Sequence, residues 1–362
     1  MTKLNYSIKG FDYCEFYVGN AKQTAYYYQR AMGFQLIAYQ GLETGNREKV
    51  SYVLNQNKIN FVITSPLIKN TKIGTHINTH GDGIKDVAFT VDNATNAWEE
   101  SINRGAISEL EPKTISDKNG VAIISAIKTF GDTIHTFIER KNYNGPFLPG
   151  YHKIIPNSNN NNLFHIDHIV GNQPDGKMLL VCNFYEKVFQ WKRFWSVDDQ
   201  DINTEFSSLR SIVMANDNKI IKMPINEPAE GKKKSQIQEF IDYYETAGIQ
   251  HLALSTKNII KTVKKMKSNG VQFLPTPKSY YKHLTSRVGQ ITEDIKILEK
   301  LGILVDSDEN GYLLQIFTKP LQDRPTLFFE IIQRKGSNSF GKGNFKALFE
   351  SIENEQSKRG NL

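Results

Sequence analysis

Short apolar runs that are typical of buried strands alternate with helical segments along this chain. Residues 11–20 form the first run, and residues 21–33 have the pattern of a helix that ends at Gly33, because glycine is common just after a helix. Further strand-like runs follow over residues 34–40, 49–55 and 59–64. The pattern therefore predicts a β-α-β-β-β unit at the start of the chain.

A second unit of the same kind follows the first. A strand is predicted over residues 84–92 and a helix over residues 93–104, with Gly105 directly after it. Two more strands are predicted over residues 121–130 and 133–140. The first 140 residues therefore contain two similar β-α-β-β modules, of which the first has one strand more.

Segments of the first half return in the second half in the same order. The repeated pairs are Val18-Gly19-Asn20 with Val170-Gly171-Asn172, Asp86–Phe89 with His251–Leu254, and Thr136–Glu139 with Leu327–Glu330. We therefore predict an α+β protein with four βαβββ modules in two domains, at residues 1–150 and 151–362. The boundary is placed within residues 141–163, which include the low-complexity run 157–162.

Three apolar strands each carry one polar side chain that is costly to bury. Glu330 lies within Leu327–Arg334, His168 within residues 164–170, and His251 within residues 248–254. By the repeat above, the first half has Phe16, Asp86 and Glu139 at the corresponding positions. Because the histidines occur in one half only, the pattern favours chemistry in the second half over a requirement of the fold.

Two histidines and one carboxylate from separate strands indicate a metal site. This ligand set is the facial triad of non-haem Fe(II) oxygenases, and octahedral iron with three protein ligands keeps three positions open. Tetrahedral zinc would keep only one. The other six histidines are interpreted as ordinary structural residues, namely His76, His80, His135, His152, His165 and His283.

The composition narrows the class of protein. The net charge is +7, but the lysines are scattered, which argues against a nucleic-acid partner. No apolar run approaches the length of a membrane span, and the first residues lack the apolar core of a signal peptide. Cys14 and Cys182 form no paired motif, so we expect free core thiols and a cytoplasmic location.

The last forty residues suggest a cover for the site. Residues 336–345 place glycines around two phenylalanines, and an amphipathic helix is predicted from there to about residue 355. This composition is typical of a movable lid. A phosphate-binding loop is the competing interpretation, but no Gly-Lys-Ser/Thr sequence follows.

Six ordered motifs resemble the 4-hydroxyphenylpyruvate dioxygenase family. They are Phe-His-Ile-Asp-His-Ile-Val (164–170), Pro-Ile-Asn-Glu-Pro (224–228), Lys-Ser-Gln-Ile-Gln (234–238), Gly-Ile-Gln-His-Leu-Ala-Leu (248–254), the segment 314–334 and Phe-Gly-Lys-Gly-Asn-Phe-Lys-Ala-Leu-Phe (340–349). The resemblance covers about residues 8–356 and is densest in the second half. It implies the vicinal-oxygen-chelate fold, the fold of glyoxalases and extradiol dioxygenases, with a C-terminal lid helix.

The resemblance also implies the site. One Fe(II) per chain would bind His168, His251 and Glu330. Substrate would contact Ser211, Asn226, Gln236, Gln250, Gln315, Phe317, Phe328, Phe340 and Phe345. Independently of the family, Ser211, Gln250 and Gln315 are polar residues within apolar strands, so they need partners or a ligand.

The implied reaction converts 4-hydroxyphenylpyruvate and O2 into homogentisate and CO2 in tyrosine breakdown. It combines oxidative decarboxylation, ring hydroxylation and side-chain migration. Family members suggest a homo-oligomer, either a dimer or a tetramer, with no nucleic-acid or membrane partner. Three alternatives stay open: 4-hydroxymandelate synthase, a metal-free binding protein on the same fold, and a ring-cleaving catechol dioxygenase.

Overall fold

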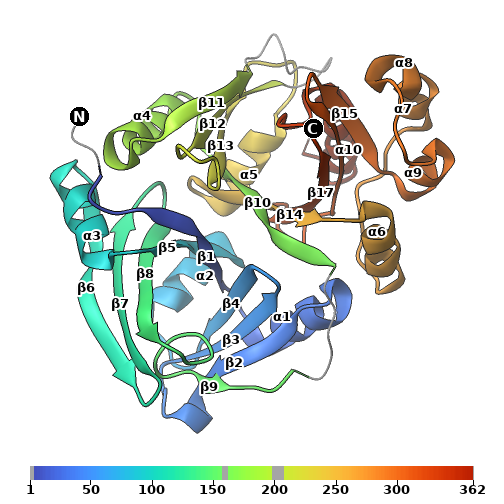
Figure 1. Cartoon of the computed structure of the whole chain (residues 1–362). Coiled ribbons are helices and arrows are strands. Elements are labelled where there is room, and N and C mark those ends of the chain that lie inside the picture. Colours follow the sequence, from blue (N-terminus) through green and yellow to red (C-terminus); the bar gives the residue numbers. More distant parts are fainter. Residues whose placement is uncertain (1–3, 157–161, 198–207, 362) are drawn as a thin grey trace.

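The computed structural model describes residues 4–156, 162–197 and 208–361, in two curled sheets with helices against them (Figure 1). The first sheet has the strand order β6-β7-β8-β5-β1-β4-β3-β2-β9 and the second β11-β12-β13-β10-β14-β17-β16-β15. Most of the low-complexity run, residues 157–161, lies outside the described residues.

Each sheet is built from two βαβββ modules, which confirms the predicted fold class. The first half contains β1 (Ile8–Tyr17), α1 (Ala21–Tyr27), η1 (Tyr28–Met32), β2 (Gln35–Gln40), η2 (Leu42–Thr44), β3 (Lys49–Gln56), β4 (Ile59–Pro66), α2 (Lys72–His80), β5 (Gly83–Val91), α3 (Ala94–Asn103), β6 (Ile107–Asp117), β7 (Gly120–Lys128), β8 (Ile134–Tyr143) and β9 (His152–Lys153). The predicted helix over 21–33 is α1 continued by η1, and it ends at Gly33 in the left-handed conformation (φ 83°).

The second half repeats this order with added helices. It contains β10 (Leu163–Asn172), α4 (Met178–Phe189), β11 (Lys192–Val197), β12 (Ser208–Ala215), β13 (Lys222–Ala229), α5 (Gln236–Tyr244), β14 (Gly248–Thr256), α6 (Ile259–Ser268), α7 (Lys278–Lys282), α8 (Leu284–Val288), α9 (Ile295–Leu301), β15 (Leu304–Asp308), β16 (Gly311–Phe317), β17 (Phe328–Lys335), η3 (Lys342–Asn344) and α10 (Phe345–Lys358). The expected C-terminal helix is therefore present as α10.

Strand β6 completes the second module, although the sequence analysis missed it. Its eleven residues carry no buried side chain, so it lacks the apolar alternation that marks a half-buried strand. Its backbone pairs with β7 along its whole length. The pairing, rather than burial, therefore makes it a strand.

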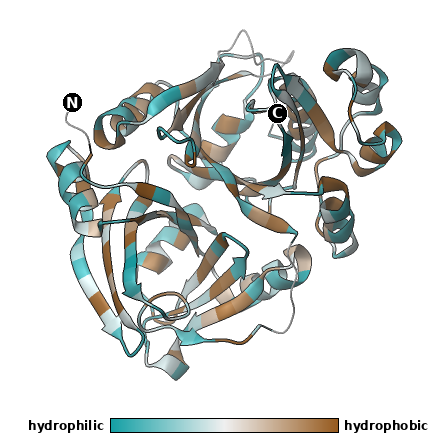
Figure 2. Cartoon of the chain, viewed as in Figure 1, coloured by the Kyte–Doolittle hydropathy of each residue, from teal (hydrophilic) through white to brown (hydrophobic). Residues whose placement is uncertain are grey.

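The two halves share one apolar core. The rings of Phe61 on β4 and Phe329 on β17 stack in parallel with their centroids 5.6 Å apart. The ring of Phe34 also stacks on Phe61, with centroids 4.6 Å apart. The backbone N–H of Lys58 donates to the carbonyl of Phe164 at 2.9 Å, which ties the β3–β4 turn to β10. Figure 2 shows apolar residues gathered along the strands, while the helices α3 and α6 are largely polar.

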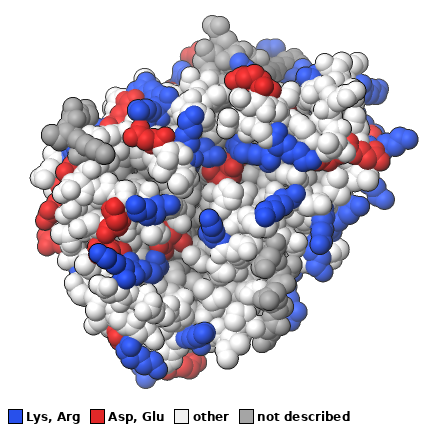
Figure 3. Space-filling model, in the orientation of Figure 1, with Lys and Arg blue, Asp and Glu red and all other residues white. Residues whose placement is uncertain are grey.

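The surface charges, the cysteines and the helices bear on the predictions about partners and location. Lys and Arg are spread over the face in Figure 3, with Asp and Glu between them. Cys14 and Cys182 are buried and unbridged. Within the described residues, no helix has the length and apolarity needed to cross a membrane. The cytoplasmic location and the lack of a nucleic-acid partner stay predictions.

Strand pairing corrects the internal alignment of the two halves. Tyr13 pairs with Ala88 across β1 and β5, as His168 pairs with Ala253 across β10 and β14. Both strand pairs also carry register shifts at matching places, between Phe11 and Tyr13 and between Ile166 and His168. The counterpart of His168 is therefore Tyr13 and not Phe16, because pairing rather than the Val-Gly-Asn motif sets the register.

Strand pairing also corrects the residue of the first half that corresponds to Glu330. Phe89 pairs with Phe137 in the first half, where Leu254 pairs with Ile331 in the second, so Glu330 corresponds to Thr136. Glu139 corresponds instead to Gln333, and both side chains accept a backbone N–H at the start of a helix, from Ala94 and Ile259. That position caps a helix in both halves.

The first half therefore holds a hydrogen-bonded cluster where the second holds the triad. The hydroxyls of Tyr13 and Thr136 donate to the Asp86 carboxylate at 3.0 and 2.5 Å. Burial raises the pKa of Asp86 to about 7; hydrogen bonds from Thr136 and Tyr13 oppose this rise, and the charge of Glu15 adds to it. The cluster satisfies Asp86 without any cation.

Asp86→Asn is expected to change how stability depends on pH. Folded Asp86 keeps its proton up to about pH 7, whereas the unfolded carboxyl loses it near 3.8, so its contribution to stability falls as pH rises between these values. The uncharged Asn avoids this loss, which for three pKa units is at most about 4 kcal/mol. The melting temperature of the variant relative to wild type should therefore rise from pH 5 to pH 8.

Asp92→Asn is the matched control. Slight burial would raise the pKa of Asp92, but hydrogen bonds from Ser7 outweigh this effect and lower the pKa. The Asp92 carboxyl is therefore ionised in both the folded and the unfolded state over the same pH range. Its stability difference from wild type should stay constant. An equally constant difference for Asp86→Asn would contradict the raised pKa.

Candidate metal centre

Three neighbouring strands carry the predicted ligands on one face of the second sheet. His168 on β10 pairs with Ala253 on β14, and Ala253 pairs with Glu330 on β17. His251 lies two residues before Ala253 and so shares its face. The small Ala253 side chain, fully buried between the two outer ligands, leaves room above the sheet for an ion.

The three side chains converge to within metal-binding distance of one another. One ligand atom from each of His168, His251 and Glu330 lies within 4.8 Å of the others. The Nε2 atoms of His168 and His251 are 3.3 and 3.6 Å from Glu330 Oε2. Donor atoms bound to one ion at about 2.1 Å are themselves about 3 to 3.5 Å apart, so this set fits a single metal ion.

The outer nitrogen of each imidazole is already engaged. His168 Nδ1 lies 2.8 Å from Asp167 Oδ1, and His251 Nδ1 lies 3.0 Å from Gln250 Oε1. Such contacts fix the tautomer and ring orientation of metal-binding histidines. They leave Nε2 of both rings free to bind an ion beside Glu330.

The electrostatics of the metal-free triad follow from burial and mutual attraction. Burial alone would raise the pKa of Glu330, but attraction and hydrogen bonds from His168 and His251 outweigh it and lower the pKa to about 2. Burial alone would lower the pKa of His168, yet Glu330 and Asp167 raise it above its usual range. For His251, burial dominates and lowers the pKa. Glu330 is therefore an anionic ligand at neutral pH.

Gln315 links Glu330 to the chain just before α10. Its Nε2 donates to Glu330 Oε1 at 3.0 Å, and its Oε1 accepts from Asn344 Nδ2 at 2.8 Å. Gly341 approaches the same amide: a Cβ there would lie 1.9 Å from Gln315 Oε1, and its φ of +79° is left-handed. A glycine is therefore needed for this loop to reach Gln315.

A cavity lies above the triad, and the empty space there measures about 450 Å³ when the open solvent at its edge is counted. Its walls come from β10, β11, β12, β13, β14, β16, β17 and the segment 340–348. Besides the triad, six residues expected to contact substrate line it: Ser211, Asn226, Gln315, Phe317, Phe340 and Phe345.

The other three expected contacts lie at a neighbouring cavity. Gln236, Gln250 and Phe328 line a space between α5, β17 and α10. Gln250 and Phe328 both touch His251, the latter by stacking on its ring with centroids 4.7 Å apart. Phe328 lies opposite His251 in the pairing of β14 with β17 and so shares the face of the triad, whereas Gln250 holds His251 through its contact with Nδ1.

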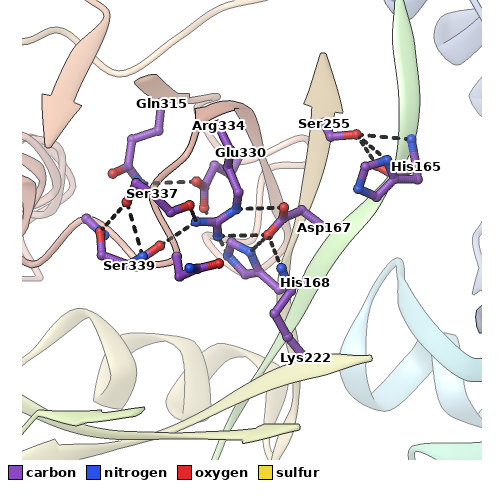
Figure 4. Close-up of polar contacts among 12 residues, drawn as sticks. His165, Asp167, His168, Lys222, Ser255, Gln315, Glu330, Arg334, Ser337 and Ser339 are labelled. Carbon is purple, nitrogen blue, oxygen red and sulfur yellow. Dashed lines mark hydrogen bonds and ion pairs between the residues drawn. The ribbon is translucent and has the colours of Figure 1, made fainter. Parts of the chain in front are cut away.

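Several residues at the site were not singled out from the sequence. Trp195 and Leu348 line the cavity, and Asp167, Lys222 and Arg334 form the charged layer behind His168 (Figure 4). Asp167 stands directly before His168 in an apolar strand and was detectable as a second buried charge. Arg334 and Lys222 are distant in sequence and carry no local signal.

The remaining histidines have structural contacts or are exposed. His80 and His135 are buried and hydrogen-bonded, and His76 is buried beside Tyr244. His165 points away from the triad toward Ser255, as Figure 4 shows. It thus provides a natural control for the two candidate ligands.

The chain matches two family models and several relatives that share one name. The family model "Hydroxyphenylpyruvate dioxygenase, HPPD, N-terminal" matches residues 5–149, and that of the "Glyoxalase/Bleomycin resistance protein/Dioxygenase superfamily" matches residues 165–316. A 4-hydroxyphenylpyruvate dioxygenase of Xenopus tropicalis is 51% identical over 97% of this chain and 92% of its own length. One of Dictyostelium discoideum is 49% identical over 98% and 100%.

Solved structures agree on the fold. A triple mutant of 4-hydroxymandelate synthase from Streptomyces coelicolor superposes with a TM-score of 0.88 at 29% identity, over 96% of this chain and 99% of that one. A xylose isomerase-like TIM barrel/4-hydroxyphenylpyruvate dioxygenase fusion protein shares the fold at a TM-score of 0.74 and 20% identity, over 96% of this chain and 53% of that one.

Removing any one ligand is expected to abolish tight metal binding. His168→Ala, His251→Ala and Glu330→Gln each leave two ligands, which should weaken binding of a divalent ion by more than about 100-fold. Anaerobic titration with Fe(II) or Co(II) measures this. His165→Ala, on the same strand as His168, should bind like wild type. Wild-type affinity in any of the three ligand variants would remove that residue from the site.

Proposed function

The chain belongs to the 4-hydroxyphenylpyruvate dioxygenase family, and from that premise we propose that its second half converts 4-hydroxyphenylpyruvate and O2 into homogentisate and CO2. The observation that carries this proposal is the buried triad of His168, His251 and Glu330 at the floor of a cavity with aromatic and amide walls. The reaction balances without a further reductant, because the 2-oxo acid supplies the electrons.

Fe(II), one ion per chain, is the proposed cofactor. Two imidazoles and one carboxylate suit ferrous iron and keep three positions open for small ligands. When bound, the ion supplies the activation of O2 that no amino-acid side chain provides. The protein's own part is to hold the substrate, orient its ring and exclude water.

Charge favours an anionic substrate at the metal end of the cavity. The carboxylates of Asp167 and Glu330 are matched in number by the cations of Arg334 and Lys222. A divalent ion on the triad therefore adds net positive charge in a buried place. A 2-oxo acid, which carries one carboxylate beside a carbonyl, compensates part of that charge.

Amide and hydroxyl groups form the polar wall that would hold the substrate. Ser211 and Asn226 are directly opposite each other on β12 and β13, so both project from the same face. Asn226 Nδ2 lies 3.4 Å from Asn172 Oδ1, a long contact that leaves it available to a ligand. These groups suit the polar ends of the substrate.

Aromatic side chains also line the cavity. Phe317 lies on β16, whereas Phe340 and Phe345 come from the chain leading into α10. Phe340 packs its ring against that of His168, with centroids 5.1 Å apart at 71°. A phenol ring between these side chains would be shielded from water, which supports a lid role for this segment.

A dimer or tetramer is the assembly that we propose from the family resemblance. 4-Hydroxymandelate synthase activity is the second candidate, because a mutant of that enzyme has a closely similar structure. Relatives at about half identity are named as the dioxygenase, which favours the first.

Product identity and gas stoichiometry test the proposal. With Fe(II) and 4-hydroxyphenylpyruvate, we expect one O2 consumed and one CO2 released per homogentisate formed, followed by an oxygen electrode, CO2 trapping and chromatography. Recovery of 4-hydroxymandelate would support the synthase. Oxygen uptake with a catechol in place of 4-hydroxyphenylpyruvate, without release of CO2, would indicate ring cleavage. No oxygen uptake with either compound would leave a binding protein.

Substitutions of Gln250 and Asn226 are expected to impair different properties, metal binding in the first case and catalytic efficiency in the second. Asn226→Ala removes a cavity amide and should lower kcat/KM about tenfold with unchanged metal affinity. Gln250→Ala removes the support of His251 and should weaken metal binding about tenfold or more. Steady-state kinetics and Co(II) titration separate the two effects. Unchanged metal affinity in Gln250→Ala would return Gln250 to the group of direct substrate contacts.

A further inference from the structure

A buried ion pair lies directly behind the metal ligand His168. The Asp167 carboxylate is 4% exposed and accepts from Arg334 Nε and Nη2 at 2.8 and 2.9 Å. Lys222 Nζ approaches it at 3.2 Å, and His168 Nδ1 at 2.8 Å (Figure 4). One carboxylate thus joins the metal ligand to two cations.

The other side of Arg334 holds the loop that leads to α10. Its Nη1 donates to the carbonyls of Ser337 and Ser339 at 3.2 and 2.6 Å. Its guanidinium lies over the ring of Phe340, 5.4 Å from the centroid, and Phe340 in turn contacts His168. His168, Asp167, Arg334 and Phe340 therefore form a closed ring of contacts, which we call the clamp.

The first half contains the same clamp at the corresponding repeat positions. Asp12 precedes Tyr13 as Asp167 precedes His168, and Arg140 lies four residues after Thr136 as Arg334 lies four after Glu330. Arg140 binds the Asp12 carboxylate through both terminal nitrogens. The Asp–Arg pair therefore belongs to both modules of the duplication.

The aromatic member is repeated as well. Arg140 Nε donates to the carbonyl of Phe147 at 2.8 Å, and its guanidinium lies 5.3 Å from that ring centroid. Phe147 contacts Tyr13 with centroids 5.4 Å apart at 63°, which closely matches the pair of Phe340 and His168. The clamp holds the segment that follows β8 in the first half and the segment that follows β17 in the second.

The two clamps differ in how they meet the cavity residue. In the first half, Asp12 accepts from Thr90 Oγ1 at 2.7 Å, while the Tyr13 hydroxyl turns to Asp86. In the second half, Asp167 accepts from the ring of His168. In both halves the arginine thus contacts the segment that follows its strand. Only in the second half does the aspartate also bind the ring of the residue that faces the cavity, His168.

We propose that the clamp couples metal binding to the position of residues 336–345. Asp167 is a positioning residue that orients His168 toward the ion, and Arg334 positions both Asp167 and Phe340. Coupling of this kind is reciprocal, so an ordered loop strengthens metal binding and a bound metal orders the loop. The inference rests on the proposed function only in that His168 is taken as a metal ligand.

The first-half clamp supplies matched controls for the test. Asp167→Asn and Arg334→Gln are compared with Asp12→Asn and Arg140→Gln in the full-length protein, with Co(II) as the probe. Calorimetry and the cobalt absorption spectrum report binding, and hydrogen exchange of the 336–345 segment reports loop order. Arg334→Lys, which keeps the charge but not the paired hydrogen bonds, is included in case Arg334→Gln does not fold.

The second-half variants should lose cobalt affinity or the protection of the loop by cobalt. Asp167→Asn should bind Co(II) about 10- to 100-fold more weakly and show an altered spectrum. Cobalt should protect residues 336–345 from exchange in wild type, and should protect them less in Arg334→Gln and Arg334→Lys. Both first-half variants should lose thermal stability but keep cobalt affinity within about twofold of wild type.

Three results would overturn the coupling. They are cobalt affinity in Asp167→Asn within twofold of wild type, equal weakening in Asp12→Asn, and unchanged cobalt protection of the loop in both Arg334 variants. Failure of wild type itself to bind cobalt would remove the metal site and the proposed function along with the clamp. The two failures are therefore distinguishable.

Discussion

The buried carboxylate of Glu330 is the constraint on which the rest of this structure depends. It lies on an inner strand of the second sheet at 2% exposure, where an unpaired charge is strongly unfavourable. Its oxygens meet Gln315 Nε2 and the two Nε2 atoms of His168 and His251. These partners sit on β16, β10 and β14, which together with β17 are four consecutive strands of the sheet, so satisfying Glu330 links all four.

The duplicated half shows which features belong to the fold and which to the chemistry. Tyr13, Asp86 and Thr136 occupy the triad positions in the first sheet and satisfy one another through hydroxyl groups. A hydroxyl cluster neutralises one carboxyl without attracting an ion, whereas two imidazoles and a carboxylate leave lone pairs directed at one point. The difference between scaffold and metal site thus lies in three side chains on equivalent backbones.

Local sequence pattern predicted most strands of the first half, the three polar residues of the triad and α10, because each has its signal within a few residues. It failed for β6, whose exposed residues carry no alternation, and for the internal alignment, which followed the Val-Gly-Asn motif instead of the strand register. Gln250 and Phe328 both contact His251, and their expected contact with substrate stays a prediction. The register of the paired strands depends on contacts between segments that are distant in sequence, and no local pattern encodes those contacts.

The triad and the segment that leads to α10 are held in place by different kinds of contact. His168, His251 and Glu330 lie on the paired strands β10, β14 and β17, so the sheet fixes their backbone positions relative to one another. The segment from Ser337 to Phe345 is outside the sheet and is held by side-chain contacts of Arg334 and Gln315. Side-chain contacts can break one at a time, and backbone ladders cannot. The α10 side of the cavity therefore depends on side-chain contacts, whereas the side with the triad depends on the pairing of the sheet.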